Sequence, residues 1–164
     1  MAVAFTIALE DLGAREFVDD LGRRAGDLSQ LMDDIGAKAA NAARERIIRT
    51  NVGPDGQPWA PSQRARETGG KTLLETGQLV DSITYAASPR SVEIGSNVIY
   101  AGIHQKGGEI RPGSANALSF QLPNGEFATV GKVTIPARPY LGLSEDDEGD
   151  IIDLTEQYFA GKLR

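Results

Sequence analysis

Residues 27–50 read DLSQLMDDIGAKAANAARERIIRT. Apolar residues recur in this stretch at steps of three and four, which is typical of an α-helix with one buried face. These positions are Leu28, Leu31, Met32, Ile35, Ala39, Ala42, Ala43 and Ile47. Asp27 is suited to cap the first turn, and Arg44, Arg46 and Arg49 lie near the C-terminal end, where the helix dipole favours cations. We therefore predict a long core helix that lies across a β-sheet.

The composition indicates one domain without covalent cross-links. A chain of 164 residues is long enough for a hydrophobic core, and its 19 glycines indicate many turns. The absence of Cys excludes disulfide bonds, thiolate metal sites and cysteine nucleophiles. We expect a single domain over residues 1–164 of the α+β class, in which a mostly antiparallel β-sheet is packed by the long helix and by shorter helices.

The charge of the chain is acidic and unevenly distributed. The formal net charge of -6 should repel a phosphate backbone, so we expect no stable nucleic-acid binding. Residues 44–71 hold six basic and three acidic residues, whereas residues 144–164 hold seven acidic and two basic ones. Such complementary segments suit contacts between copies of the chain, although two ordinary solvated faces would look the same.

The N-terminus does not have the pattern of a secretory signal. Residues 2–9 are largely apolar, but no basic flank precedes them and Glu10 and Asp11 follow at once. No apolar run approaches the ~20 residues that cross a bilayer, so we expect no membrane contact.

The remaining elements are short and are separated by turn residues. We predict a strand over residues 3–9, helices over 11–25 and 76–83, a hairpin of strands 83–87 and 92–95, a helix over 98–106, a hairpin of 118–122 with 126–130, a strand over 133–135, and a last helix after Ser144. Thr76, Asn97 and Ser144 are the expected caps of their helices. Gly107 is expected to end its helix in the left-handed conformation.

Residues 51–72 are predicted to form a long mobile loop. They contain four Gly, three Pro and almost no apolar periodicity, and Gly53-Pro54-Asp55-Gly56 is typical of a tight turn. Trp59, the only Trp of the chain, lies in this loop. It is either a plug that pins the loop to the core or an anchor that becomes buried when a partner binds.

The sequence contains no convincing catalytic or metal-binding pattern. Residues 65–72, ARETGGKT, resemble a relaxed phosphate-binding loop, but no buried strand precedes them. Residues 144–155 place Gly149 at the sixth position of a calcium loop, but Ser144 would be its first position and Thr155 its twelfth, where a carboxylate belongs, so the match fails. His104 is the only His, which excludes triads and multi-histidine metal sites within one chain. We expect its imidazole to hydrogen-bond a backbone group, and we expect no enzyme activity, cofactor or metal.

Three segments share an order and spacing that is more specific than any one of them. They are PDGQPWAP at residues 54–61, LETGQLVDSI at 74–83, and a third that runs from VEIG at 92–95 through YAGIHQKGG at 100–108 to IPARPYLGL at 135–143. Together they resemble the phage virion morphogenesis family, the tail-completion proteins of Mu-like and related contractile-tailed bacteriophages. Similar proteins often carry an aromatic residue in place of Lys106.

This resemblance implies a non-enzymatic protein at the head-proximal end of the tail, which finishes the tail and lets it join the filled head. The implied partners are tail terminator, tail tube and head–neck connector proteins, and a homo-oligomeric ring in the virion is expected after assembly in the host cytoplasm. A tail-tube, baseplate or portal-side connector subunit is the rival interpretation. The candidate partner-contacting residues are Trp59, Arg64, Arg66, Lys71, Tyr100, His104, Gln105 and Arg138.

Overall fold

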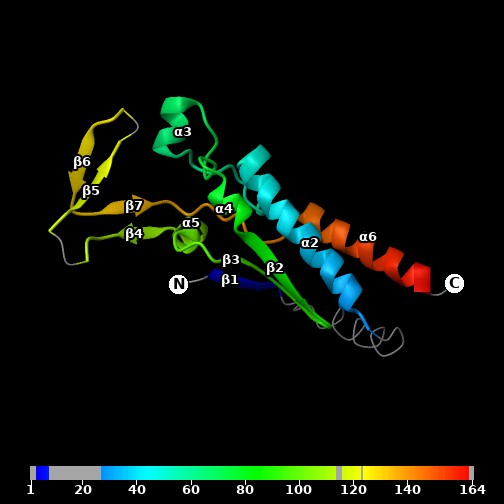
Figure 1. The fold of residues 1–164 in the computed structure, drawn as a ribbon. Helices are drawn as coiled ribbons and strands as arrows, with labels where there is room; N and C mark the ends of the chain where they lie inside the picture. Colours follow the sequence, from blue (N-terminus) through cyan, green and yellow to red (C-terminus); the bar gives the residue numbers. More distant parts are fainter. Residues whose placement is uncertain (1–2, 8–26, 114–115, 123, 163–164) are drawn as a thin grey trace.

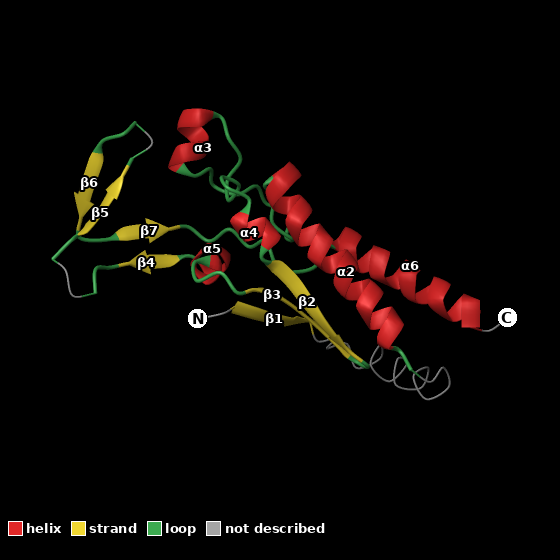
Figure 2. Cartoon of the chain, viewed as in Figure 1, coloured by secondary structure: helices red, strands yellow, loops and turns green. Residues whose placement is uncertain are grey.

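A computed structural model describes residues 3–7, 27–113, 116–122 and 124–162 of the chain (Figure 1). The described residues form helices and strands that pair only in antiparallel fashion, which confirms the predicted α+β class (Figure 2). The helix predicted over residues 11–25 lies outside the described residues and stays a prediction.

The described elements follow the predicted order closely. The helices are α2 (Ser29–Glu45), which continues into the π-helical turn η1 (Arg46–Thr50), α3 (Gln63–Thr68), α4 (Gln78–Asp81), α5 (Ala101–Lys106) and α6 (Glu145–Lys162). The strands are β1 (Val3–Ile7), β2 (Ile83–Ser88), β3 (Ser91–Ser96), β4 (Gly108–Ile110), β5 (Leu118–Gln121), β6 (Phe127–Val130) and β7 (Val133–Ile135).

The main sheet has three antiparallel strands in the order β1-β3-β2. β2 and β3 form the predicted hairpin, in which Ser88 lies opposite Ser91 beside the turn. β1 pairs with the other edge of β3, where Phe5 lies opposite Ile94. The strand predicted at the N-terminus is therefore confirmed over Val3–Ile7.

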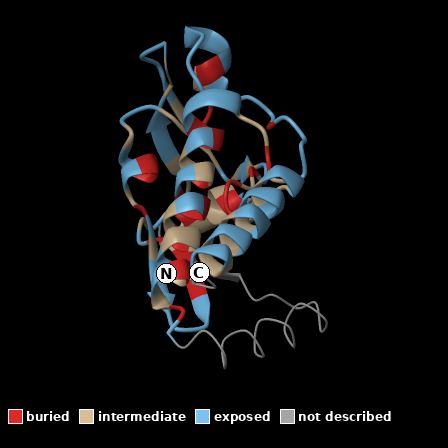
Figure 3. Cartoon of the chain, turned by 90° about the vertical axis from the view of Figure 1, so that its right-hand side faces the viewer, coloured by how far each residue is buried: buried red, intermediate tan, exposed pale blue. Residues whose placement is uncertain are grey.

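Helix α2 packs on β2 and β3, and α6 packs on α2. The predicted apolar stripe of α2 faces the interior, and its buried residues are Leu31, Gly36, Ala39, Ala40 and Ala43. Gly36 and the three Ala residues let the helix approach the sheet closely: a Cβ atom on Gly36 would lie 2.3 Å from Cδ2 of Tyr85. Figure 3 shows that the outer side of α6, in contrast, is mostly exposed.

Both ends of α2 have specific structures. The N-cap residue of α2 is Leu28 and not the predicted Asp27, although Oδ1 of Asp27 accepts a hydrogen bond from the backbone N–H of Ser29 at 2.9 Å. At the other end the helix widens into the π-helical turn and stops at Asn51, whose φ of 54° is left-handed. π-helical turns are rare and often occur at functional positions. Here the turn places two adjacent residues, Arg46 and Ile47, in the interior.

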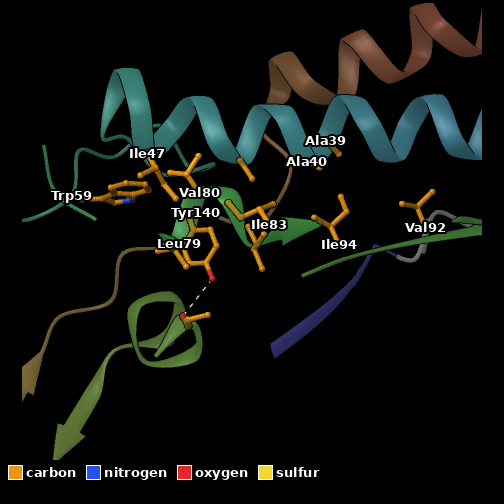
Figure 4. Packing of buried hydrophobic residues seen from close by; sticks show 13 residues of the cluster. Ala39, Ala40, Ile47, Trp59, Leu79, Val80, Ile83, Val92, Ile94 and Tyr140 are labelled. Carbon is orange, nitrogen blue, oxygen red and sulfur yellow. Dashed lines mark hydrogen bonds between the residues drawn. The ribbon is translucent and has the colours of Figure 1, made fainter. Parts of the chain in front are cut away.

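The hydrophobic core lies between α2, the main sheet and α4 (Figure 4). The largest fully buried side chains are Tyr140, Ile47 and Ile83. Leu79 and Val80 of α4 pack against them, and Trp59 covers one end beside Ile47 (Figure 4). The hydroxyl of Tyr140 donates a long hydrogen bond of 3.5 Å to the carbonyl of Ala101. Burial raises the pKa of Tyr140 to about 12, because the phenolate would be poorly solvated there.

A buried ion pair joins the start of α6 to α2. The guanidinium of Arg46 pairs with Asp147 and also donates to the carbonyls of Tyr140 and Gly142, at 3.1 and 2.9 Å. The carboxylate of Asp147 accepts hydrogen bonds from the N–H and the hydroxyl of Ser144, at 2.8 and 2.7 Å. Ser144 therefore caps α6 as predicted. Arg46 does more than complement a helix dipole, since it connects two helices.

Two short helices begin later than the sequence indicates. α4 begins at Gln78 and its N-cap residue is Gly77, so the predicted cap at Thr76 is wrong, although Thr76 Oγ1 accepts a hydrogen bond from the N–H of Gln78 at 3.3 Å. α5 begins at Ala101 and not at residue 98, because residues 97–100 are not helical, so the predicted cap at Asn97 is wrong.

Gly107 ends α5 with a φ of 71° and a ψ of 179°. The positive φ requires glycine, but the ψ value is not that of the left-handed helix, so the predicted conformation is wrong in ψ. The reason is a close approach of the chain, since a Cβ atom at Gly107 would lie 2.7 Å from the nitrogen of Ala137.

Two two-stranded ribbons project from the body of the molecule (Figure 1). The first pairs β4 with β7, and the second pairs β5 with β6. We call the second ribbon, residues 118–130, the β5–β6 arm. Its hairpin and the strand over residues 133–135 were predicted, whereas β4 was not, because the three residues Gly108–Ile110 are too few to show a pattern.

Candidate partner-binding surface

Asn51 closes the base of the segment 51–72. Its Oδ1 accepts a hydrogen bond from the N–H of Thr72 at 2.8 Å, and its Nδ2 donates to the carbonyl of Ile47 at 2.8 Å. The buried hydroxyl of Thr72 accepts from the N–H of Ser62 at 3.1 Å. The segment also contains the short helix α3, which the sequence did not predict because it has no apolar periodicity. The predicted mobility of the segment stays a prediction.

Trp59 is buried within the single chain. Its side chain is 7% exposed, and its Nε1 donates a hydrogen bond to the carbonyl of Pro139 at 3.1 Å. The backbone N–H of Trp59 donates to the carbonyl of Asn51 at 2.9 Å. This environment is that of a plug, the first of the two alternatives. A contact of Trp59 with a partner stays a prediction.

Arg64 and Lys71 support the fold of the same segment. Nη2 of Arg64 donates to the carbonyls of Lys71 and Leu74, at 2.6 and 2.8 Å. Nζ of Lys71 donates to the carbonyl of Arg49. Arg66, in contrast, is exposed, and its side chain makes no hydrogen bond or ion pair with the described residues. Of these three candidate residues, Arg66 is the one with a free cationic group.

An open groove of about 460 Å³ collects four of the eight candidate residues. They are Arg64, Tyr100, His104 and Arg138. Leu73 and Leu79 add apolar surface, and Ser62, Glu75, Thr76, Gly77 and Gln78 complete the lining. We call this feature the Arg138 groove. Residues far apart in the sequence meet here, because the groove is built from α3, α4, α5 and the strand-like segment before Tyr140.

The wall formed by α5 is fixed by contacts of Tyr100 and His104. Their rings meet edge to face with centroids 5.8 Å apart, which confirms the predicted stacking. The hydroxyl of Tyr100 donates to Gln78 Oε1 at 3.0 Å, and the carbonyl of His104 accepts from the N–H of Arg138 at 2.7 Å. The prediction for the imidazole is wrong: Nδ1 of His104 is buried and has no hydrogen-bond partner among the described residues. The backbone of His104, not its ring, makes the pinning contact.

Arg138 is a largely buried residue whose guanidinium reaches the groove and has no counterion among the described residues. It is 5% exposed, and its Nε donates to the carbonyl of Ala60 at 2.8 Å. Its terminal nitrogens make no hydrogen bond or ion pair with any described residue. Burial and the positive charge of Arg66 lower the pKa of Arg138. Burial and the charge of Arg138 lower the pKa of His104, which favours the neutral imidazole at pH 7.

Gln105 points away from this surface into the interior. It is 9% exposed, and both ends of its amide are hydrogen-bonded to the backbone of residues 140–141. The structure gives Gln105 an internal role, and a contact with a partner stays a prediction.

A second exposed surface was not singled out from the sequence. Ile110, Phe120 and Phe127 are 39%, 39% and 74% exposed, and the two Phe lie in the β5–β6 arm. Large exposed apolar side chains mark contact surfaces when they gather on one projecting element. The alternation of Leu118 and Phe120 correctly predicts a strand. It does not reveal that Phe120 stays exposed, with no helix or sheet of the described residues packed over it.

The rejected ligand motifs are also unsuited in structure. In residues 65–72 the helix α3 comes before the glycines, which reverses the order of a phosphate-binding loop, and residues 145–155 are helical. No group of three or more His, Cys, Asp or Glu that could hold a metal ion occurs among the described residues. Within the same part of the chain, no helix has the length and apolarity that a membrane crossing needs.

The fold and this surface define a small α+β protein with an open, basic groove and a projecting apolar arm. The chain belongs to the phage virion morphogenesis family, whose family model matches residues 9–160. It is 32% identical over 115 residues to the Mu-like prophage FluMu G protein 2 of Haemophilus influenzae, an alignment that covers 70% of each chain. It is 27% identical over 173 aligned residues to the putative capsid assembly protein G of Escherichia phage Mu, which covers 100% of this chain and 99% of that protein. No solved structure matches the chain significantly.

Proposed function

We propose that this protein is a structural neck component that completes the tail at its head-proximal end and allows the tail to join the filled head. It acts without a cofactor and without catalysing a reaction. Its partners are tail terminator, tail tube and head–neck connector proteins, and several copies form a ring. The observation that carries the proposal is the family match over residues 9–160.

The geometry supports a role in assembly because the chain has several distinct contact surfaces. The β5–β6 arm exposes Phe127 at a distance from the core, and the Arg138 groove exposes basic and aromatic groups. Aromatic residues and Arg are the types that most often dominate the binding energy of protein interfaces. The net charge of -6 reduces the affinity for DNA, which suits a protein that DNA passes.

A second candidate is a head-side function, such as a portal-side connector. The name of the relative in phage Mu, a putative capsid assembly protein, favours it. The two candidates differ in the particles that accumulate when the protein is missing. A tail-tube or baseplate subunit would give a third pattern, because tubes or baseplates would be absent.

Electron microscopy of lysates from a phage that lacks this gene distinguishes these candidates. We expect filled heads and full-length tails that lie separately, and we expect joined virions when the wild-type protein is supplied from a plasmid. Empty or leaking heads would favour the head-side role, and absent tubes would favour a tail-tube subunit. Normal virions without the protein would contradict every version of the proposal.

A further inference from the structure

We propose that the Arg138 groove receives a carboxylate from the outer face of α6 of a second copy of this chain. The inference rests on the proposed ring and deepens it by naming the contact between neighbouring copies. The outer face of α6 is defined here by Glu145, Glu148, Ile152 and Glu156.

The groove provides a cation whose partner is missing. A guanidinium has five N–H donors, and Arg138 uses only Nε, toward Ala60, among the described residues. The terminal nitrogens of Arg138 reach the groove, and a carboxylate that approaches both of them forms two charge-assisted hydrogen bonds, which are stronger than neutral ones. Arg66 adds a second positive charge near the first, since it contributes to the lowered pKa of Arg138. Glu75 also lines the groove, but its carboxylate lies 3.8 Å from Nε of Arg64, so Arg138 is the cation of the groove that is available to an acidic side chain.

Other groups in the groove also lack partners or can accept an apolar neighbour. Nδ1 of His104 is buried without a hydrogen bond to the described residues. The ring of Tyr100 and the side chain of Leu73 line the same groove and are partly exposed. An occupant with a carboxylate beside an apolar side chain matches this mixture better than an isolated anion does.

The outer face of α6 has this mixture. Its four residues follow one another at steps of three and four, so they share one side of the helix. All are exposed, with Ile152 at 58%, and the three glutamates make no side-chain hydrogen bond or ion pair with the described residues. Asp147 and Asp150, by contrast, are paired with Arg46 and Lys38 of the same chain. Asp146 and Asp153 are also exposed and unpaired among the described residues, but they lie on an adjoining side of α6, so the outer face is the side on which unpaired acids flank an exposed apolar residue.

A contact of this kind must join two copies through different surfaces. α6 runs away from α3, α4 and α5 in Figure 1, so its outer face and the groove occupy different parts of the molecule. Each copy then offers its groove to one neighbour and its α6 to another. Such a heterologous contact closes into a ring or continues as a filament.

Sedimentation velocity of the full-length protein over a range of concentrations tests the contact. One variant carries Glu148→Lys and Glu156→Lys and thus loses the α6 surface. A second carries Arg138→Gln, and Arg66→Glu replaces it if Arg138→Gln fails to fold, because the Arg66 side chain has no contact to lose within the described residues. We expect wild-type protein to associate beyond a dimer. For each variant we expect the association constant to fall by about tenfold or more.

Mixing the two variants gives the sharpest result. The α6 variant keeps its groove and the groove variant keeps its α6, so an equal mixture should form one-to-one dimers that grow no further. The control is Glu93→Lys, one exchange of the same kind on an exposed residue of β3, which makes half the charge change of the α6 variant and should associate as the wild type does.

Three outcomes would overturn the inference. They are a wild-type protein that stays monomeric at every concentration, variants that associate as well as the wild type, and a short DNA duplex that binds wild-type protein but not Arg66→Glu. Any of these, together with separate heads and tails in the gene-deleted phage, would remove the groove contact and leave the proposed function intact.

Discussion

Gln105 holds the backbone of Leu141 with both ends of its side-chain amide. Nε2 donates to the carbonyl of Leu141 at 2.9 Å, and Oε1 accepts from the N–H of Leu141 at 3.0 Å. The same oxygen accepts from the N–H of Tyr140 at 2.9 Å. A buried segment outside any sheet needs such partners, because unpaired backbone groups are costly in the interior.

Replacement of Gln105 by Leu should therefore destabilise the protein strongly. It leaves two N–H groups and one carbonyl of residues 140–141 without partners. With about 1–3 kcal/mol for each unsatisfied group and partial relaxation, we expect the free energy of unfolding to fall by roughly 3 kcal/mol. Urea denaturation measures this. Gln157→Leu, at an exposed position of α6, is the control and should change it little.

Trp59→Ala should lower the free energy of unfolding by about 3–5 kcal/mol, as truncation of a buried aromatic residue does. Trp59→Phe keeps most of the volume but leaves the carbonyl of Pro139 without its donor, and should cost about 1 kcal/mol. Thermal and urea denaturation check both values. The anchor alternative predicts the opposite pattern: a Trp59→Ala protein of normal stability that no longer supports joining of heads to tails.

Gly36→Ala should separate α2 from the sheet, because the new Cβ atom would meet the ring of Tyr85 at 2.3 Å. Overpacking of this kind costs about 1–3 kcal/mol, although Ala is the better helix former. Gly149→Ala is the matched control in α6, where a Cβ atom meets nothing within 4 Å, and it should stabilise the protein by about 1 kcal/mol. Equal effects of both substitutions on the urea midpoint would contradict the close packing of α2.

Asp147→Asn should weaken the junction between α2 and α6. The substitution leaves Arg46 buried without its anion, and the loss of one partner of a buried pair costs about 3–5 kcal/mol at full burial. Because the Asp147 side chain is 15% exposed, we expect about 2–3 kcal/mol. Asp146→Asn, at the exposed preceding position, should cost no more than about 0.5 kcal/mol through the helix dipole. Amide hydrogen exchange in α6 is an independent measure.

The raised pKa of Tyr140 predicts a loss of stability in alkali. The folded protein keeps the phenol proton up to a pKa of about 12, whereas the ordinary value is 10.0. Between these values the unfolded chain binds fewer protons than the folded one, so the free energy of unfolding falls as the pH rises through this range. Tyr140→Phe removes the group and should flatten this part of the pH profile while changing stability little at pH 7. An unchanged alkaline slope in Tyr140→Phe would mean that other groups cause it.

The periodicity of apolar residues was sufficient to predict most helices and strands. It was not sufficient to predict which elements pack on each other. The stripe of residues 27–50 predicted a helix and its buried side, and alternation around Ser88 and Ser91 predicted the central hairpin. Arg46 looked like a cation at the end of a helix, and its real partner, Asp147, lies 101 residues further along the chain. Spacing alone cannot reveal such a pair, because it forms only when α6 packs on α2.

The structure brings some of the candidate residues together, while their contact with a partner stays a prediction. Arg64, Tyr100, His104 and Arg138 do meet in one groove, although nothing in their spacing places residue 138 beside residue 104. The burial of Gln105 was missed because no sequence pattern marks a side-chain amide that hydrogen-bonds the backbone of a distant segment. The N–H of Val98 donates a hydrogen bond to Oγ of Ser96 and not to the side chain of Asn97. Which of two adjacent polar residues accepts this bond depends on where the preceding strand ends, and β3 ends at Ser96.

The β5–β6 arm has a consequence for how this protein changes through evolution. The arm shares no residue with the hydrophobic core, and β4 and β7 are the strands that carry it. Substitutions at its exposed Phe positions change the surface of the arm and leave the packing of the core as it was. In the proposed function, contacts with neighbouring proteins could therefore change in the arm alone, without any change in the residues of the core.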